Sequence, residues 1–507
     1  DMHIYSGGYL GIGQDTTTTT KNDSVYCFSS NIINEGILVC AASSSSSTFF
    51  DINNDLHLVL KQPMYLVNEN PMNPTAHFIV EPGITLGFDS TTSAADSAIV
   101  GNGSFDLLGG AMLKIASKDG ITQSPVAKGN IQTDTRNFDA TATYIYNRNK
   151  TGTQSTGDGL PNPLLGELIV NLGSNANQPL TLSAPVSIGD GSNGGTLTLT
   201  RGNLQTDGTN LLTINSDATL NGGSVTSYIS GPMKKIGNTD FVFPIGKGGI
   251  FGKVGLVSMA AIPPTQEFTA EYFHSAYSDV ANANVNAPLN HVSHKEYWTI
   301  TANTNVTNGT LNAGNTKVQL FSNSSTVSQI TDLTTLRVAH YNGTKWDNAG
   351  NTATTGSLPG VVSVTSNSIN TFSPFTFATT SNMTNPLPLT LISFNGTVNG
   401  VNSLYWVSAR ELNVARFDIE RSLNGVDFIN IGTVKAVGTT DFNKYNFNDT
   451  KTPEGVSYYR LRIFDKDGTS KLSGIIALNN KKNNNQIITV FPNPVKDVAF
   501  ITLQASS

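Results

Sequence analysis

Hydrophobic residues in the segment 194–225 come in short pulses that recur about every six to nine residues, with Gly, Asn, Asp, Thr and Ser between them. The pulses are Leu197 with Leu199, Leu204, Leu212 with Ile214, Leu220, and Val225. None is long enough for a helix. Alternation within a pulse and turn residues between pulses predict short strands. Brief, evenly spaced strands favour a coiling solenoid over an open sheet.

The same pattern runs back toward the N-terminus. We therefore predict one right-handed parallel β-helix over residues 1–227, in which each coil buries its Leu, Ile and Val side chains against the neighbouring coils. The segment 127–163, which carries Tyr144, Tyr146 and Arg148, interrupts the rhythm. We expect it to leave the coil as a loop.

Strands become longer and more aromatic after residue 227, which predicts a β-sandwich module over residues 228–384. Asn342-Gly343, between LRVAHY and TKW, is a strong hairpin signal. Prolines at 386 and 388 indicate a linker. Strands resume after it, and we predict a second module over residues 385–482.

The second module is predicted to be a sandwich that resembles immunoglobulin or fibronectin type III domains. Its alternating strands place apolar residues on facing sides: Leu404, Trp406, Phe417, Ile419, Tyr459, Leu461 and Ile463. Tyr459 suits either a tyrosine corner or an ordinary core position.

Composition supports an all-β fold. Only 13% of the 507 residues are charged, about half of the usual share of about 25%, and Thr, Ser, Asn and 47 Gly take their place. The net charge is −6 and basic residues do not cluster, which argues against nucleic acid and anionic membranes as partners. The sequence contains no apolar run long enough for a transmembrane helix.

The chain has two cysteines, Cys27 and Cys40. A disulfide between them would stabilise the fold by about 3 kcal/mol in the chain-entropy model, and two buried free thiols fit the sequence equally well. No further cysteine is available to complete a zinc set, so we assign no metal ligand and no cofactor.

Catalytic motifs are absent from the sequence: it has no GxSxG elbow, no phosphate-binding GxxxxGK[ST] and no HExxH. Glu267 and Glu271 are expected to face the same side of a strand about 13 Å apart, too far for a glycosidase pair. His291 and His294 have a spacing that could bind metal but lack carboxylate partners, and we expect them in a loop.

One charged cluster keeps an enzymatic alternative open, because β-helix lyases and hydrolases carry Asp, Lys and Arg in one groove. Its members lie in or beside the predicted loop: Asp134, Arg136, Asp139, Arg148 and Lys150. We assign no catalytic residue and predict a chain that is not an enzyme, with a polysaccharide lyase or hydrolase as the alternative.

The last stretch, IITVFPNPVKDVAFITLQ, carries the motif Phe491, Pro492, Asn493 and Pro494. It resembles the start of the type A sorting domain of Bacteroidetes cargo that leaves the cell through the type nine secretion system. The module that precedes it resembles the immunoglobulin-like module of such cargo, and SYISGPMKKIG, FVFPIGKGG and FSPFTFAT resemble a module of large, repetitive surface proteins of these bacteria. Residues 487–507 cover only the beginning of a sorting domain, which in the family continues for several more strands.

This resemblance implies partners and a location. The sorting domain of the family docks on the secretion machinery and an outer-membrane carrier, and is removed when the cargo is attached to surface lipopolysaccharide. The same bacteria attach O-linked glycans at Asp followed by Ser or Thr and a small residue, a motif that Thr16, Ser24, Ser90 and Ser97 fit. Solvated turns explain these four positions as well.

From these observations we expect a secreted, surface-displayed protein with an adhesive or structural role. The solenoid would present a face lined by Thr and Asn for many weak contacts with glycans or other surfaces. A passive subunit of an envelope assembly is a third alternative.

Overall fold

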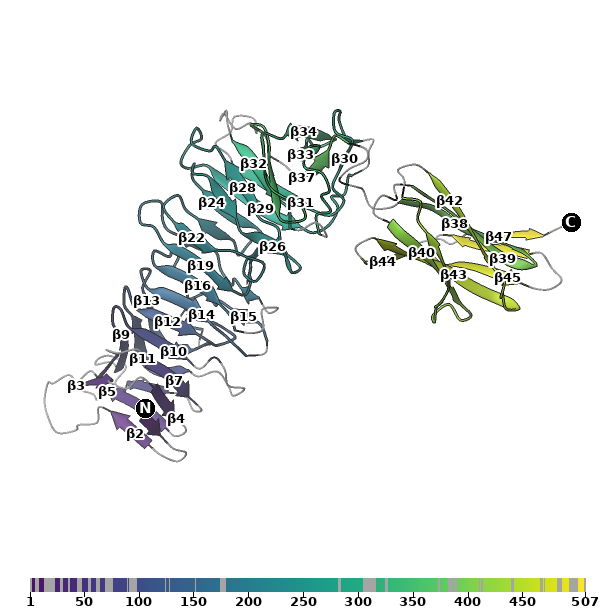
Figure 1. The fold of residues 1–507 in the computed structure, drawn as a ribbon. Coiled ribbons are helices and arrows are strands. Elements are labelled where there is room, and N and C mark those ends of the chain that lie inside the picture. The colour runs from purple at the N-terminus through teal and green to yellow at the C-terminus, as the bar shows by residue number, and fades with distance from the viewer. Residues whose placement is uncertain are drawn as a thin grey trace.

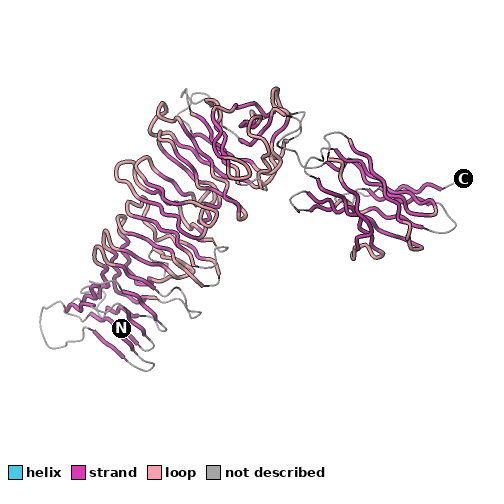
Figure 2. The backbone as a smooth tube through the Cα atoms, in the orientation of Figure 1, coloured by secondary structure: helices cyan, strands magenta, loops and turns pink. Residues whose placement is uncertain are grey.

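The structure of the chain, a computed structural model, consists of strands and the turns between them, without helices in the residues that it describes (Figure 2). Before residue 76 and after residue 480 it describes the backbone of the strands, with few side chains. The ranges in between are 76–88, 98–123, 128–150, 152–173, 179–280, 284–303, 316–323, 327–372, 374–381, 390–409, 414–438, 442–465 and 470–480, with a few isolated positions.

A β-solenoid of about five turns occupies residues 77–230. Figure 1 shows it as a stack of parallel strands. We number the eight sheets of the chain 1 to 8. Sheet 1 is one solenoid face and follows the order β1 (Met2–Ile4), β4 (Asn31–Asn34), β7 (Leu56–Leu60), β10 (Thr85–Phe88), β12 (Met112–Ile115), β14 (Thr143–Tyr146), β16 (Glu167–Asn171), β19 (Thr196–Arg201) and β22 (Thr219–Gly222).

The other solenoid faces are divided between three sheets. Sheet 2 contains β2 (Tyr9–Ile12), β5 (Ile37–Ala42), β8 (Met64–Asn68), β11 (Ile99–Leu107), β13 (Ile131–Phe138), β9 (Ala76–Val80), β6 (Thr48–Ile52) and β3 (Asp23–Cys27). Sheet 3 contains β15 (Gln154–Ser155), β17 (Leu180–Thr181), β20 (Leu204–Gln205), β23 (Ile229–Ser230), β26 (Ile245–Lys247) and β27 (Ile250–Phe251). Sheet 4 begins with β18 (Val186–Ile188), β21 (Leu212–Ile214) and β24 (Met233–Ile236).

The predicted ladder lies in these coils. Leu168 pairs in register with Leu197, and Leu197 with Leu220, so that equivalent side chains stack along the solenoid. Leu168 and Leu197 are fully buried, and burial of such a side chain stabilises a fold by roughly 1.5 to 3 kcal/mol. Val225 is an exception, because it lies in a turn and is 69% exposed. The prediction of a β-solenoid is thus confirmed for residues 77–230, while its right-handedness and its extension over the residues before 77 stay predictions.

Glycines allow the coils to approach closely at one corner of the solenoid. Gly166 and Gly195 immediately precede the sheet 1 strands β16 and β19. A Cβ atom on Gly166 would lie 2.0 Å from the carbonyl oxygen of Ala142, and one on Gly195 would lie 2.4 Å from that of Leu164. The neighbouring backbone occupies this space, so a larger residue would push the coils apart.

The prediction that residues 127–163 leave the coil as a loop is wrong. Both β13 and β14 lie in this segment and pair in parallel with the preceding coil. The side chains of Tyr144 and Tyr146 are fully buried and take the core positions that aliphatic residues fill in other coils. Their hydroxyl groups donate to the carbonyl oxygens of Asp139 and Thr156, at 2.7 Å each.

Antiparallel sheets follow the solenoid without a break in the core. Sheet 4 continues from β24 through β29 (Glu267–Phe273), β31 (Tyr297–Asn303), β37 (Phe375–Thr379), β33 (Leu336–Tyr341) and β34 (Trp346–Gly350), with β30 (His291–Val292) beside β37. Sheet 5 contains β25 (Phe241–Phe243), β28 (Val254–Val257), β32 (Lys317–Phe321), β36 (Val362–Thr365) and β35 (Ala353–Gly356). One cluster of buried hydrophobic residues runs from Met64 to Phe377 and spans the solenoid and both sheets.

The long strands predicted after residue 227 are present. Asn342-Gly343 forms the turn between β33 and β34, where the Asn342 amide donates to the Lys345 carbonyl oxygen and Gly343 has a φ of 99°. The predicted boundary at residue 227 lies inside the continuous core. The assignment of this part as a sandwich module stays a prediction.

A separate hydrophobic core lies in the C-terminal module. Sheet 6 contains β38 (Thr390–Asn399), β39 (Val401–Ala409) and β42 (Asn443–Asp449), and sheet 7 contains β41 (Ile429–Lys435), β40 (Val414–Ser422), β43 (Gly455–Asp465), β44 (Ser470–Leu472) and β45 (Ile476–Asn480). Sheet 8 is the pair β46 (Gln486–Phe491) and β47 (Phe500–Ala505). The seven apolar residues predicted to face inward in this module are all buried.

Tyr459 lies in a buried network of side chains. Its hydroxyl donates to Asp449 Oδ2 at 2.8 Å and accepts from the Asn402 amide at 2.9 Å, while Arg421 donates to the same Asp449 oxygen at 2.7 Å. A tyrosine corner would direct the hydroxyl to the backbone, so the bonds of Tyr459 fit a core position with a polar network.

Among the described residues there is no helix that could cross a membrane.

Candidate functional site

An open groove lies on the solenoid where one face is interrupted. It holds roughly 1090 Å³, including the solvent at its mouth, and its lining residues are Asp106, Leu107, Leu108, Gln123, Arg136, Asn137, Phe138, Asp139, Gly159 and Pro161. In the part of the chain that the structure describes, β13 pairs with β11 and with no strand on its other edge. The next coil crosses this position as a turn-rich segment and returns to strand pairing at Leu164, which bridges to Ile188.

Asp106 is the most heavily bonded carboxylate of the groove. It lies on β11, and its carboxylate oxygens form hydrogen bonds with His77 Nδ1 at 2.9 Å, the Ser104 hydroxyl at 3.1 Å and the Asn137 side-chain amide at 2.5 Å. Burial raises the pKa of Asp106, but the hydrogen bonds from His77 and Asn137 and the charge of His77 outweigh it, so the pKa is lowered overall. Asp106 is therefore an anion at neutral pH, oriented by three side chains.

These groups come from three successive coils. His77 lies on β9, Asp106 on β11 and Asn137 on β13, where Asp106 and Asn137 are direct partners in the register. His77 and Asn137 are separated from Asp106 by 29 and 31 residues in sequence, which is the length of one coil. Coiling thus brings together side chains that no short motif could reveal.

Arg136 and Asp139 belong to the cluster predicted from the sequence, and both line the groove. Arg136 Nη1 donates to the carbonyl oxygen of Val126 at 2.8 Å and to that of Ile131 at 3.3 Å, which holds the neighbouring loop in place. Burial lowers the pKa of Arg136, and the nearby carboxylates of Asp158 and Asp134 oppose this effect.

Asp139 serves the turn after β13. Its Oδ1 atom accepts the backbone amide of Thr141 at 2.8 Å and the hydroxyl of the same residue at 2.7 Å. Both bonds fix the turn, so Asp139 is already engaged at the rim of the groove.

The other members of the predicted cluster lie elsewhere. Arg148 Nη1 donates to the Ala116 carbonyl oxygen at 2.8 Å, which ties two coils together. Asp134, Arg148 and Lys150 are not among the lining residues. The structure therefore brings two of the five residues to the groove. It adds Asp106 and Asn137, and His77 bonded to Asp106, all three of which sequence reasoning missed.

Glu267 and Glu271 face the same side of β29, as predicted. Glu267 accepts from Lys234 at 2.9 Å and Glu271 from Lys247 at 3.0 Å, so both carboxylates take part in ion pairs. His291 is buried in β30 rather than in the predicted loop, and its Nε2 atom lies 2.6 Å from the Asn385 carbonyl oxygen. Within the described ranges no three His, Cys, Asp or Glu residues gather as a metal site.

Several predicted sites fall on residues whose side chains lie outside the description. Cys27 lies in β3 and Cys40 in β5, and only their backbone is described. Phe491 ends β46, while the sorting-motif residues Pro492, Asn493 and Pro494 lie outside the described residues.

The predicted glycosylation positions are placed to different extents. Ser90 is half-buried in a bend, and its carbonyl oxygen accepts the Asn149 amide at 3.1 Å. Ser24 lies in β3 without a described side chain, and Thr16 and Ser97 lie outside the described residues.

Comparisons with known proteins give no family for the chain. No protein-family model, no curated protein and no solved structure matches it. Its function is therefore inferred from its own residues.

Proposed function

We propose that the chain is a secreted cell-surface protein with an adhesive or structural role, and that its solenoid binds glycans through many weak polar contacts. The observation that carries this proposal is the groove at β13, in which a carboxylate and an amide from successive coils are held in fixed positions. Fixed acceptors and donors of this kind suit the hydroxyl groups of a sugar, because a preorganised site loses little entropy on binding.

The outward face of sheet 1 supports the same proposal. One row runs across the coils through Thr143, Glu167, Thr196 and Thr219, which are in register. The hydroxyl of Thr198 donates to Glu167 at 2.5 Å and joins this row to its neighbour. Successive strands lie about 4.8 Å apart, so hydroxyl and carboxylate groups repeat along the solenoid at the scale of one sugar unit in an extended glycan.

Export rests on the sequence. The FPNP motif and the modules before it resemble cargo of the type nine secretion system, which implies the secretion machinery and an outer-membrane carrier as partners. We propose that the protein is delivered to the bacterial surface or released by this route. A strain that lacks the pathway should retain the protein inside the cell, and surface exposure of the protein in that strain would contradict this part of the proposal.

Glycan binding is tested with a panel of plant, algal and bacterial polysaccharides. The intact protein should bind at least one of them, and Asp106→Asn should weaken binding by about tenfold, the effect of losing one charge-assisted hydrogen bond. Asp207→Asn, at an exposed turn of another coil, is the matched control and should bind as the natural protein does. Absence of binding to every member of the panel would sink the adhesive role.

An enzyme of polysaccharide degradation is the second candidate, and one observation favours it. His77 and Asp106 form a His–carboxylate pair beside an open groove, an arrangement that can move protons. Release of reducing or unsaturated sugar ends by the natural protein, abolished by Asp106→Asn, would establish this candidate in place of the adhesive role. A passive subunit of a larger envelope assembly is the third candidate. In size-exclusion chromatography of the native material, such a subunit would elute at an apparent mass well above the 53.8 kDa of the chain.

A further inference from the structure

We propose that the outer face of sheet 7, in the C-terminal module, binds anionic polysaccharides through a row of preoriented arginines. The surface, which we call the arginine face, consists of Arg416 on β40, Lys435 on β41, and Arg460 and Arg462 on β43. It is distinct from the solenoid groove and does not depend on the proposed export or on the ligand of the groove.

Strand alternation places these side chains on the outside of the module. Phe417 and Ile419 on β40 and Leu461 and Ile463 on β43 are buried in the core. The residues between them point to the opposite side of the sheet.

Glu420 holds two of the arginines. Its Oε2 atom accepts from Arg460 Nε and its Oε1 atom from Arg462 Nε, both at 2.6 Å. The guanidinium carbon of Arg460 also lies 3.9 Å from the ring centre of Phe428. Both guanidinium groups therefore have a defined orientation before any ligand arrives.

Arg416 is held in the same manner on the other half of the face. Its Nε atom donates to Asp418 Oδ1 at 3.1 Å, and its guanidinium carbon lies 3.9 Å from the ring centre of Phe464. Thr433 donates its hydroxyl to the same oxygen of Asp418 at 2.8 Å. Each of the three arginines is thus fixed through Nε.

The terminal nitrogens of the arginines are left for a ligand. Among the described residues, the Nη atoms of Arg416, Arg460 and Arg462 have no hydrogen-bond acceptor. These nitrogens form the planar fork that binds a carboxylate or sulfate group with two parallel hydrogen bonds. Since the carboxylates occupy only Nε, the fork of each arginine stays open.

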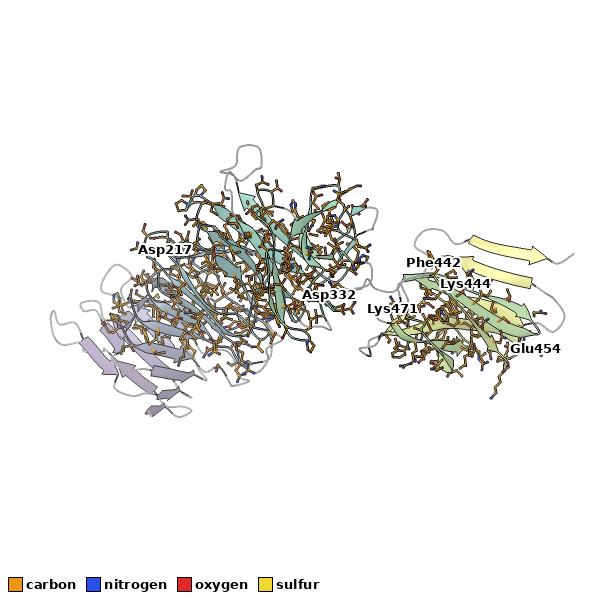
Figure 3. The ribbon with its side chains drawn as sticks, turned by 45° about the horizontal axis from the view of Figure 1, so that its top comes forward. Asp217, Asp332, Phe442, Lys444, Glu454 and Lys471 are labelled. Atoms are coloured by element: carbon orange, nitrogen blue, oxygen red, sulfur yellow. The ribbon has the colours of Figure 1, made fainter. Side chains whose placement is uncertain are left out.

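The charge seen from solvent is positive. The side chains of Asp418 and Glu420 are only 10% and 9% exposed, whereas that of Arg416 is 43% exposed. Lys435 is exposed beside Arg416 in the register. By contrast, Lys471 on β44 pairs with the core residue Ile463 and so does not belong to this face. Figure 3 shows Lys471 and Glu454 toward opposite ends of the module. Although the chain has a net charge of −6, the arginine face is positive and therefore favours an anionic partner.

The spacing favours a polymer with regularly placed anions. Arg460 and Arg462 are two residues apart on one strand, which sets their Cα atoms roughly 6.6 Å apart. Arg416 lies on the neighbouring strand, diagonal to Arg462, with its Cα atom roughly 7 to 8 Å from that of Arg462. Forks fixed at such intervals suit the carboxylate or sulfate groups of a linear polysaccharide, whereas a fluid bilayer offers no fixed spacing.

The test uses the full chain and three probes at low salt: heparin as a sulfated chain, polygalacturonate as a carboxylated chain, and dextran as a neutral one. We expect binding to one or both anionic chains, none to dextran through this face, and weakening of binding as salt is raised. The double variant Arg416→Gln, Arg462→Gln should lower affinity for the anionic chain at least about tenfold, since two sets of charge-assisted hydrogen bonds to the ligand are lost.

Two controls keep the result interpretable. Lys444→Gln removes an exposed positive charge from sheet 6, outside the arginine face, and should leave affinity within about twofold. Lys435→Gln removes a charge from the arginine face without disturbing Glu420, and should weaken binding to the anionic chain. If both arginine-face variants fold and bind anionic chains as the natural protein does, the proposal is wrong. Preferential binding to anionic lipid vesicles or to polyglutamate, with no affinity for either polysaccharide, would also overturn it.

Discussion

Glu296 is a buried carboxylate whose ionisation should control how the stability of the solenoid and the sheets that share its core depends on pH. It lies just before β31 with no solvent exposure. Its Oε2 atom accepts from the Tyr272 hydroxyl at 2.9 Å and from the Asn323 amide at 3.1 Å, while Oε1 has no hydrogen-bond partner. Burial raises the pKa of Glu296 from 4.5 to about 7, although hydrogen bonds from Ser328, Tyr272 and Asn323 oppose it.

The sign follows from proton binding. Because the pKa is higher in the folded than in the unfolded chain, the folded state binds the proton more tightly, and stability is lost as pH rises from about 4.5 to about 7. Each tenfold change in proton affinity corresponds to about 1.4 kcal/mol, so the loss attributable to Glu296 is about 3 kcal/mol and is complete above that range.

Glu296→Gln removes this loss, since the amide oxygen can still accept from Tyr272 and the group no longer ionises. Urea unfolding at about pH 4.5 and about pH 8, followed by tryptophan fluorescence, measures the effect, and Trp298 in the same core contributes to this signal. From the lower to the higher pH, the free energy of unfolding of the natural protein should fall by about 3 kcal/mol more than that of the variant. Asn323→Leu removes a bond that lowers the pKa, and should extend the loss to higher pH. Equal pH dependence in Glu296→Gln and the natural protein would refute the reasoning.

Three further substitutions test the packing. Leu197→Ala should destabilise the solenoid by about 2 to 5 kcal/mol in urea unfolding, because it empties a fully buried ladder position. Gly195→Ala should lower the melting temperature, whereas Gly208→Ala, where a Cβ meets nothing within 4 Å, should not. Tyr459→Phe should destabilise the C-terminal module by about 1 to 3 kcal/mol in calorimetry, because buried polar partners lose their bonds. Tyr458→Phe, a half-buried neighbour, should cost less.

Periodicity was sufficient to predict the strands. The coil positions of Leu197 and Leu199 and the inward face of Trp406 follow from alternation, which is a local property of the backbone. The same rule places Glu296 on the buried side with Trp298, so the signal for this carboxylate was present in the sequence.

Sequence reasoning failed where the core departs from aliphatic residues. Tyr144 and Tyr146 interrupt the Leu, Ile and Val pattern, yet each finds a carbonyl acceptor for its hydroxyl inside the coil, so a strand remains stable. The candidate site was hidden for another reason. Its central contact, between Asp106 and His77, depends on the length of one coil, which becomes known only when the register of the strands is known.

The assignment of the groove as an adhesive glycan site is tested most directly by hydrogen–deuterium exchange of the intact protein. Exchange is measured with and without a polysaccharide, namely the neutral one that the protein binds most tightly. We predict slower exchange on binding in the segments 106–108 and 136–139, which line the groove, without release of sugar ends. Protection confined to other parts of the chain, or loss of the polysaccharide through cleavage, would contradict the assignment of the groove as an adhesive glycan site.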